Sequence, residues 1–246
     1  MEQYTALAGV YDRLMEDTDY EGFARRIDGM LKKSRLPVQL VLELGCGTGS
    51  LAYLLSQKGY EMICCDSSQG MLSAAAEKCA ALPVPPVFVC QDMCELDLYG
   101  TVQAAVCCMD SLNYLTTLAD LRQALRRVSL FMERGGLFIF DVKSEAMFRE
   151  MAGTVSLYES EDMYCVWQYG CEGRGRAAEH RVDIFEKSGG MYRRRTELHY
   201  QRAYPAELLV KELKKAGFKV KGIYSGLSRK RIKEEKGRLL FAAEKE

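Results

Sequence analysis

The apolar positions of this chain fall into short continuous runs that alternate with longer segments of helical period. The first run is 40–44, and Leu51, Leu54 and Leu55 then repeat at helical spacing. A short apolar run predicts a strand buried on both faces, which is typical of parallel sheets. Three glycines at alternate positions separate the two segments, so the chain turns sharply there. The stretch therefore predicts a strand, a tight turn and a helix.

The same alternation continues to about residue 145. We expect strands at 40–44, 60–66, 87–90, 104–109 and 137–140, and helices at 20–31, 49–58, 69–81 and 118–131. Near the start, Tyr4, Leu7, Ala8 and Tyr11 also repeat at helical spacing. Strands that alternate with helices give an open parallel sheet with right-handed connections.

From about Gly153 the period of the pattern changes to two. Apolar and polar residues alternate over 155–158, 164–169, 181–186 and 192–202. This alternation predicts an antiparallel β insertion rather than further strand–helix units. A helix at 205–216, with Pro205 in its first turn, and strands at 218–224 and 238–243 then complete the main sheet as an antiparallel pair.

The predicted fold is thus α/β, a doubly wound, seven-stranded and mostly parallel sheet with an antiparallel β insertion. We expect a cofactor-binding core with an N-terminal helical cap at 1–150, the insertion at 151–204, and the end of the core at 205–246. The insertion would form either a substrate lid or a dimer surface. The chain would be a monomer or a homodimer.

Composition narrows the class of protein. A chain of 246 residues fits one α/β domain. It has no run of the ~20 apolar residues that a membrane helix needs. The start, Met1–Tyr4, has neither a basic cluster nor an apolar core, so we expect no signal peptide and a cytoplasmic protein.

The ten cysteines do not suggest a metal site. They include the vicinal pairs Cys64–Cys65 and Cys107–Cys108 inside apolar runs, where neighbouring side chains point to opposite faces of a sheet. The sequence has no CxxC motif and only two histidines, so we expect buried thiols and no metal. Net charge is zero, but residues 1–123 carry −7 and the remainder +7. Such asymmetry suits either an anionic partner or a solvated basic face.

The glycine turn is the strongest indication of chemistry. Gly45 and Gly47 place no Cβ in the way of a ligand, and amides at the start of the next helix point toward it. A dinucleotide fingerprint would have its third glycine where Ser50 stands, whereas Gly49 comes one position early. The pattern Glu43-x-Gly45-x-Gly47-x-Gly49 resembles motif I of the class I S-adenosylmethionine-dependent methyltransferases.

Asp66 ends the second expected strand, 17 residues beyond Gly49. A carboxylate there can accept hydrogen bonds from both hydroxyls of a ribose, and it can also cap the following helix. The stretch Asp66–Leu72 resembles the D-x-S-x-x-M-L motif of the same family. That resemblance implies that Asp66 holds the ribose and that Met71 lies near the adenine.

Three further segments resemble the family. Tyr11–Met15 is similar to its opening YD segment, Asp92 and Met93 to its adenine-binding pair, and Asp110–Tyr114 to its D-S-x-N-Y motif. In the last of these, carbonyls near Met109 would hold the methionine ammonium group. Local roles remain open for each, as a packed amphipathic helix, a turn or a cap. The implied cofactor residues are Tyr11, Glu43, Gly45, Cys46, Gly47, Gly49, Asp66, Ser67, Met71, Asp92, Met93, Met109 and Asp110.

The resemblance implies transfer of the methyl group of S-adenosylmethionine, with S-adenosylhomocysteine as product, to a nitrogen or oxygen of a small-molecule acceptor. A general base is needed only if the acceptor is protonated. Candidates are Tyr11, Asp110, His199 and Tyr204, although His199 also suits a strand residue with a satisfied imidazole. The alternatives are an RNA methyltransferase, which is less favoured, an NAD-dependent oxidoreductase and a non-catalytic cofactor-binding protein.

Overall fold

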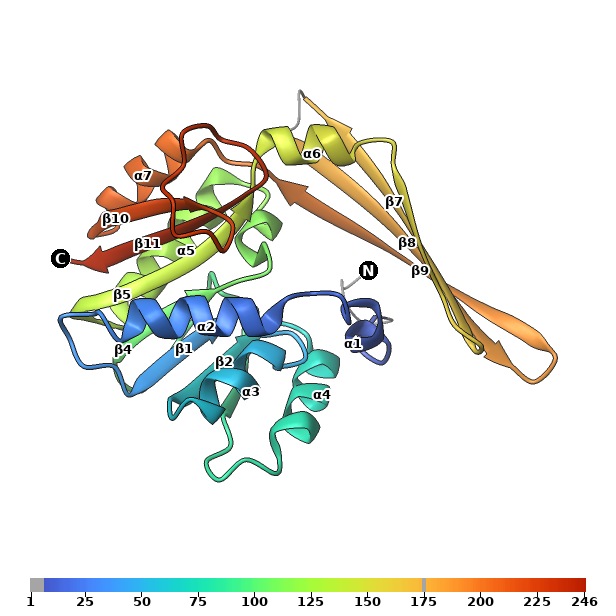
Figure 1. Ribbon diagram of the computed structural model, residues 1–246, viewed down its shortest axis with the longest axis horizontal. Helices are drawn as coiled ribbons and strands as arrows, with labels where there is room; N and C mark the ends of the chain where they lie inside the picture. Colours follow the sequence, from blue (N-terminus) through green and yellow to red (C-terminus); the bar gives the residue numbers. More distant parts are fainter. Residues whose placement is uncertain (1–6, 174–175) are drawn as a thin grey trace.

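The computed structural model describes residues 7–173 and 176–246, and its centre is a seven-stranded sheet (Figure 1). The strands are β1 (Leu40–Leu44), β2 (Glu61–Asp66), β3 (Val87–Cys90), β4 (Val102–Cys107), β5 (Met132–Lys143), β10 (Phe218–Ser225) and β11 (Arg238–Lys245). They lie in the order β10-β11-β5-β4-β1-β2-β3, and β11 runs in the direction opposite to the other six strands. The predicted mostly parallel sheet with a final antiparallel pair is confirmed.

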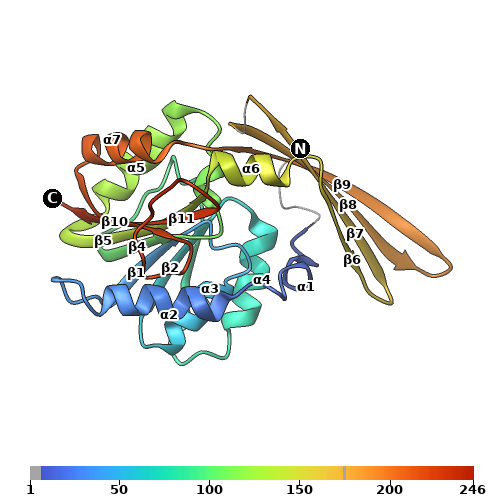
Figure 2. The ribbon, with the colours of Figure 1, turned by 45° about the horizontal axis from the view of Figure 1, so that its top comes forward.

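Helices cover both faces of this sheet (Figures 1 and 2). One face packs against α2 (Tyr20–Leu31), α3 (Ser50–Gln57) and α4 (Gln69–Cys79), and the other against α5 (Leu118–Leu130) and α7 (Ala206–Lys215). Each face has its own buried apolar core. The vicinal cysteines divide between the two cores, as predicted from the alternation of side chains along a strand.

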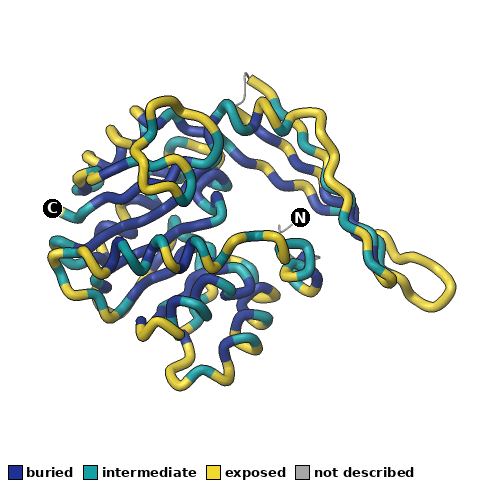
Figure 3. The backbone as a smooth tube through the Cα atoms, in the orientation of Figure 1, coloured by how far each residue is buried: buried dark blue, intermediate teal, exposed yellow. Residues whose placement is uncertain are grey.

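A second sheet projects from the first (Figures 1 and 2). After β5, helix α6 (Glu145–Met151) leads into β6 (Val155–Glu159), β7 (Met163–Glu172), β8 (Ala177–Ser188) and β9 (Met191–Arg202). These strands pair in chain order and are all antiparallel, so the predicted β insertion is confirmed. Buried and exposed residues alternate along the first half of β8 and the second half of β9, whereas the far end of the β8–β9 hairpin is exposed (Figure 3).

Several boundaries differ from the prediction. Helix α6 and the short 3-10 helix η1 (Ser111–Tyr114) were not expected from the pattern. Strand β4 ends two residues early because Met109 and Asp110 adopt φ of 57° and 55°, a conformation that a strand cannot contain. Pro205 is extended and is the N-cap of α7, so its predicted place in the first helical turn is wrong.

The N-terminal segment lies between the two sheets (Figures 1 and 2). It contains the short helix α1 (Tyr11–Leu14), and its residues Leu7 and Val10 belong to an apolar cluster with Met71 of α4 and Met163 of β7. The helical repeat predicted over Tyr4, Leu7, Ala8 and Tyr11 is wrong for residues 7–10, which form a turn before α1, and Tyr4 lies outside the described residues. Across 7–173 and 176–246, no helix combines the length and apolarity needed to cross a membrane.

Candidate active site

The turn between β1 and α3 depends on backbone conformations that favour glycine. Gly45, Gly47 and Gly49 have φ of 64°, 54° and 74°, in the left-handed region. The Gly45 amide donates to the carbonyl oxygen of Cys65 at 2.8 Å, and the Gly47 amide donates to the Asp66 carboxylate at 2.8 Å. The turn is thereby fixed to the end of β2.

The three glycines have different surroundings. A Cβ on Gly49 would lie 2.9 Å from the Cβ of Ala75, and one on Gly45 would lie 2.6 Å from the Ser111 hydroxyl oxygen. A Cβ on Gly47 would have no atom within 4 Å. Gly49 therefore permits close packing of α3 on α4, whereas Gly47 borders open space.

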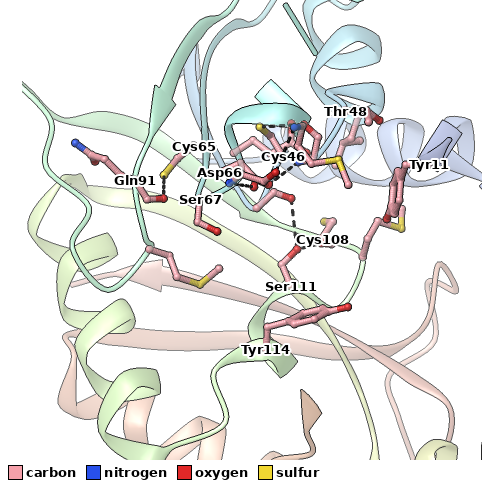
Figure 4. Close-up of a pocket in the computed structure, with 18 of the residues that line it drawn as sticks. Tyr11, Cys46, Thr48, Cys65, Asp66, Ser67, Gln91, Cys108, Ser111 and Tyr114 are labelled. Atoms are coloured by element: carbon pink, nitrogen blue, oxygen red, sulfur yellow. Dashed lines mark hydrogen bonds between the residues drawn. The ribbon is translucent and has the colours of Figure 1, made fainter. Parts of the chain in front are cut away.

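That space is a pocket of about 590 Å³ at the carboxyl ends of β1 to β4, within the usual size of small-ligand sites (Figure 4). The described residues that line it are Tyr11, Tyr20, Glu43, Gly45, Cys46, Gly47, Thr48, Leu51, Cys65, Asp66, Ser67, Ser68, Gln69, Gly70, Met71, Gln91, Asp92, Met93, Cys108, Met109, Ser111, Tyr114 and Leu115. Every predicted cofactor residue except Gly49 and Asp110 is among them. Gln91 and Tyr11 lie at opposite ends (Figure 4).

Asp66 is held in place by backbone amides. Its Oδ1 accepts a hydrogen bond from the Ser68 amide at 2.9 Å, and its Oδ2 accepts one from the Gly47 amide at 2.8 Å. Each carboxylate oxygen has a further acceptor site, so both can also receive a ligand hydroxyl. Burial raises the pKa of Asp66 above its usual value.

Glu43 is a buried carboxyl beside the same pocket. Burial, followed by the nearby Asp66 carboxyl, raises the pKa of Glu43 to about 8. Within the described residues, its Oε2 has no hydrogen-bond partner. A buried polar atom without a partner is costly, so a donor or a cation on a ligand would stabilise this position.

At the end of β3, Asp92 and Met93 line the pocket. Asp92 Oδ1 accepts a hydrogen bond from the Cys94 amide at 2.7 Å, so the local turn expected as an alternative role is present. The turn and the contact with the pocket are compatible, because they involve different parts of the same side chain and loop.

Asp110 points away from the pocket into a buried ionic cluster. It pairs with Lys143 at 2.8 Å and with Arg238 at 2.7 Å, and it accepts a hydrogen bond from Gln201 at 2.7 Å. Burial opposes its ionisation, but the two cations outweigh burial and hold the pKa of Asp110 below its usual range. This environment suits a structural carboxylate rather than the base considered from sequence.

Of the other three base candidates, Tyr11 lines the pocket, whereas Tyr204 and His199 stand behind its wall. Tyr204 is buried, and its hydroxyl donates to the carbonyl oxygens of Leu115 and Thr117, which is a structural role. His199 has an exposed fraction of 0%, and its Nδ1 lies 3.2 Å from the hydroxyl of Tyr114, which lines the pocket.

Some residues of the site were not assigned from sequence. Thr48, inside the glycine motif, donates to Asp12 at 2.5 Å, and Lys78 contacts both side chains at 3.2 and 2.9 Å. These bonds hold α1 against the pocket wall. Nothing in the pattern indicates them, because the three residues come from separate segments.

Comparisons with known proteins agree with this geometry. A family model described as "Methyltransferase domain" matches residues 41–136. YqeM of Bacillus subtilis (strain 168), provisionally named a methyltransferase, is 32% identical over 98% of this chain and 97% of its own length.

Solved structures give the same result. The crystal structure of a S-adenosylmethionine-dependent methyltransferase from Clostridium acetobutylicum ATCC 824 is 28% identical, covers 99% of each chain and has a TM-score of 0.87. The sugar N-methyltransferase KedS8 from Streptoalloteichus sp ATCC 53650 is 20% identical, covers 96% of this chain and 93% of its own, and has a TM-score of 0.80, which shows likeness of fold. Sequence, fold and pocket together show that this chain belongs to the class I S-adenosylmethionine-dependent methyltransferases.

Proposed function

We propose that the protein transfers the methyl group of S-adenosylmethionine to a nitrogen or oxygen atom of a small-molecule acceptor. The observation that carries this proposal is the chemistry of the pocket wall. Among its described residues are three carboxyl side chains, Glu43, Asp66 and Asp92, and no lysine or arginine. Phosphate backbones are bound mainly by lysine and arginine, so this wall disfavours an RNA acceptor. The sugar N-methyltransferase fold of KedS8 supports the proposal.

The pocket fits the cofactor. We assign the ribose hydroxyls to Asp66, whose oxygens are oriented by backbone amides, and the adenine to Asp92 and Met93 at the end of β3. The open space at Gly47 leaves room for the ligand to approach the backbone. Glu43, with its unpartnered oxygen, suits a hydrogen-bond donor of the cofactor.

S-adenosylmethionine, when bound, supplies a methyl group on a good leaving group, so the protein contributes alignment and a dry site. The hydroxyls of Tyr11, Tyr20 and Tyr114 lie in the wall and can orient an acceptor. The N-terminal segment and the β insertion, 151–204, would cover this end and exclude water. We therefore assign the insertion the role of an acceptor wall on the core formed by 1–150 and 205–246.

Cofactor binding can be measured by calorimetry with S-adenosylmethionine and S-adenosylhomocysteine. We expect both to bind, and Asp66→Ala to weaken binding at least tenfold, because two charge-assisted hydrogen bonds of roughly 1.5 kcal/mol or more each are lost. Asp97→Asn is the matched control, since this carboxyl is 76% exposed and pairs only on the surface with Arg127 among the described residues. Equal affinities for Asp66→Ala and the parent would refute the ribose assignment.

Acceptor identity can be found by incubating the protein with methyl-labelled S-adenosylmethionine and fractionated metabolite pools. We expect label in a small metabolite. Total RNA is incubated in parallel, and label recovered there instead would contradict the proposal. Cofactor binding without turnover on any pool would identify a non-catalytic binding protein.

A further inference from the structure

Behind the pocket wall, a chain of hydrogen bonds leads away from Tyr114. Its Oη lies 3.2 Å from His199 Nδ1, and His199 Nε2 lies 3.1 Å from Glu197 Oε2. The other oxygen of Glu197 accepts the Leu7 amide at 3.1 Å. The chain thus begins at a hydroxyl in the pocket and ends at a carboxylate between β9 and the N-terminal segment.

Proton transfer along this chain of hydrogen bonds requires one direction for each of them. With Glu197 ionised, His199 carries its proton on Nε2 and donates a hydrogen bond to the carboxylate, which only accepts. The lone pair of His199 Nδ1 then accepts from the Tyr114 hydroxyl. His199 and Glu197 are buried, and the Trp167 ring stacks on the imidazole with centroids 6.0 Å apart at 19°. Burial and stacking hold the imidazole in line with the hydroxyl and keep bulk water away from it.

We propose that Tyr114, His199 and Glu197 form a proton relay that removes the proton of the methyl acceptor. This inference rests on the proposed function and defines the acceptor further, as a group whose attacking nitrogen or oxygen carries a proton. Tyr114 is the catalytic residue because it faces the pocket. His199 and Glu197 act through it.

Methyl transfer and removal of the acceptor proton occur in one step. The lone pair of the attacking atom forms the bond to the methyl carbon, and the carbon–sulfur bond breaks with its electron pair on sulfur. The acceptor proton passes to Tyr114 Oη while the Tyr114 hydroxyl proton passes to His199 Nδ1. The resulting imidazolium is stabilised by the Glu197 carboxylate. When the product leaves, the proton returns to solvent through the pocket.

The charged groups that face the relay do not titrate in the neutral range. His180 lies opposite in the β8–β9 register, and burial followed by Lys143 lowers its pKa to about 4. Asp110 stays ionised beside Lys143. Burial and the neighbouring tyrosine hydroxyls keep the pKa of Tyr11 well above its usual value, so it stays protonated. Glu43 of the pocket wall has a pKa of about 8, so a pH dependence near neutrality reports the relay, the acceptor or Glu43, and only a difference between a variant and the parent isolates the relay.

The direction of the relay can be tested by NMR without an acceptor. The chain has two histidines, so ¹⁵N-histidine labelling gives two rings, and His180→Gln assigns them. We expect His199 as the Nε2–H tautomer at pH 7, in the free protein and with S-adenosylhomocysteine, and Tyr114→Phe shifts its Nδ1 signal. The Nδ1–H tautomer would overturn the relay, because that ring cannot take a proton from Tyr114.

The contribution of the relay to catalysis is tested with the acceptor found in the metabolite screen. Tyr114→Phe and Glu197→Gln should each lower kcat at pH 7 about 100-fold, with the calorimetric Kd for S-adenosylhomocysteine within twofold of the parent. The loss of kcat relative to the parent should become smaller as pH rises, since a deprotonated acceptor needs no base. A loss that is constant with pH shows a structural role and overturns the relay.

His180→Gln is the matched control, a second buried histidine on the same face whose ring contacts Gln201. Its kcat should stay within twofold of the parent. Melting temperatures confirm that each variant folds. A parent protein that does not bind S-adenosylhomocysteine would refute the proposed function. A Tyr114→Phe variant that binds S-adenosylhomocysteine normally and keeps the kcat of the parent would refute only the relay.

Discussion

Two carboxyl groups at neighbouring strand ends set the electrostatics of the pocket. Glu43 is on β1 and pairs in register with Cys64, two residues before Asp66 on β2. Burial raises the pKa of both carboxyls, and the Asp66 carboxyl raises that of Glu43 further, to about 8. Glu43 therefore keeps its proton at neutral pH in the folded protein, whereas the same side chain is ionised in the unfolded chain.

This difference predicts a pH-dependent stability. Because the folded pKa lies above the unfolded one, the stabilisation is fully present below about pH 4.3 and is lost as pH rises through 8. The free energy of unfolding should fall over pH 5–8 by up to about 1.4 kcal/mol per pH unit from this group. Glu43→Gln should flatten that slope in urea titrations without cofactor.

The control for this measurement is Glu95→Gln, at an exposed position after β3. It should leave the slope as in the parent. A parent and a Glu43→Gln variant with parallel pH profiles would show that Glu43 is ionised in the folded protein.

At the scale of elements, the glycine turn combines two functions in neighbouring residues. Gly49 lets α3 approach α4, because any Cβ there meets Ala75 at 2.9 Å. Gly47 has no such neighbour and borders the ligand space. One motif therefore contributes to both stability and binding, and the two contributions can be separated by mutation.

Gly49→Ala should destabilise the fold by about 2–4 kcal/mol, because strain from positive φ adds to overpacking. Gly47→Ala should cost only about 1 kcal/mol but should weaken binding of S-adenosylhomocysteine at least tenfold. Thermal unfolding and calorimetry measure the two effects.

Gly153→Ala controls for backbone strain alone, because Gly153 has φ of 77° with no atom within 4 Å of an added Cβ. It should destabilise the protein less than Gly49→Ala and leave cofactor affinity unchanged. A Gly47→Ala protein that binds like the parent would place the ligand away from this turn.

The elements themselves could largely be predicted from sequence, since continuous apolar runs and helical period are local signals. The end of β4 could not. Its left-handed residues Met109 and Asp110 donate their backbone amides to the Asp141 carboxylate at 2.8 and 3.1 Å. Arg238 pairs with the carboxylates of Asp110 and Asp141. This turn and the following η1 depend on tertiary contacts that no local pattern contains.

At the scale of the whole molecule, the N-terminal segment connects the two sheets over the pocket. On one side Asp12 bonds to Thr48 and pairs with Lys78 of α4. On the other side Arg13 bonds to Ser160 and Asp162 in the β6–β7 turn. We therefore expect this segment, which is held by polar contacts at both ends, to cover a ligand in the pocket.

Arg13→Ala should speed release of S-adenosylhomocysteine about fivefold in stopped-flow experiments, equivalent to the ~1 kcal/mol of a partly exposed ion pair. Stability should change by no more than about 1 kcal/mol. Arg25→Ala removes a comparable arginine pair on α2 and should leave release unchanged. Identical release rates in all three proteins would show that the segment does not cover the ligand.

The position of most residues that we propose to bind the cofactor could be predicted, because they follow strand ends and parallel strands end at one edge of a sheet. The acceptor side could not be predicted in this way. Tyr114 of η1 and His199 of β9 are 85 positions apart, so only the fold brings them together. The proposed relay thus depends on how the β insertion returns to the core.

The most direct test of the central claim is a crystal structure of the complex with S-adenosylhomocysteine. We expect the nucleoside at the carboxyl ends of β1 to β4, with both ribose hydroxyls within hydrogen-bond distance of Asp66 and the adenine beside Asp92. A nucleoside bound elsewhere, or an Asp66 carboxylate turned away from the sugar, would contradict it.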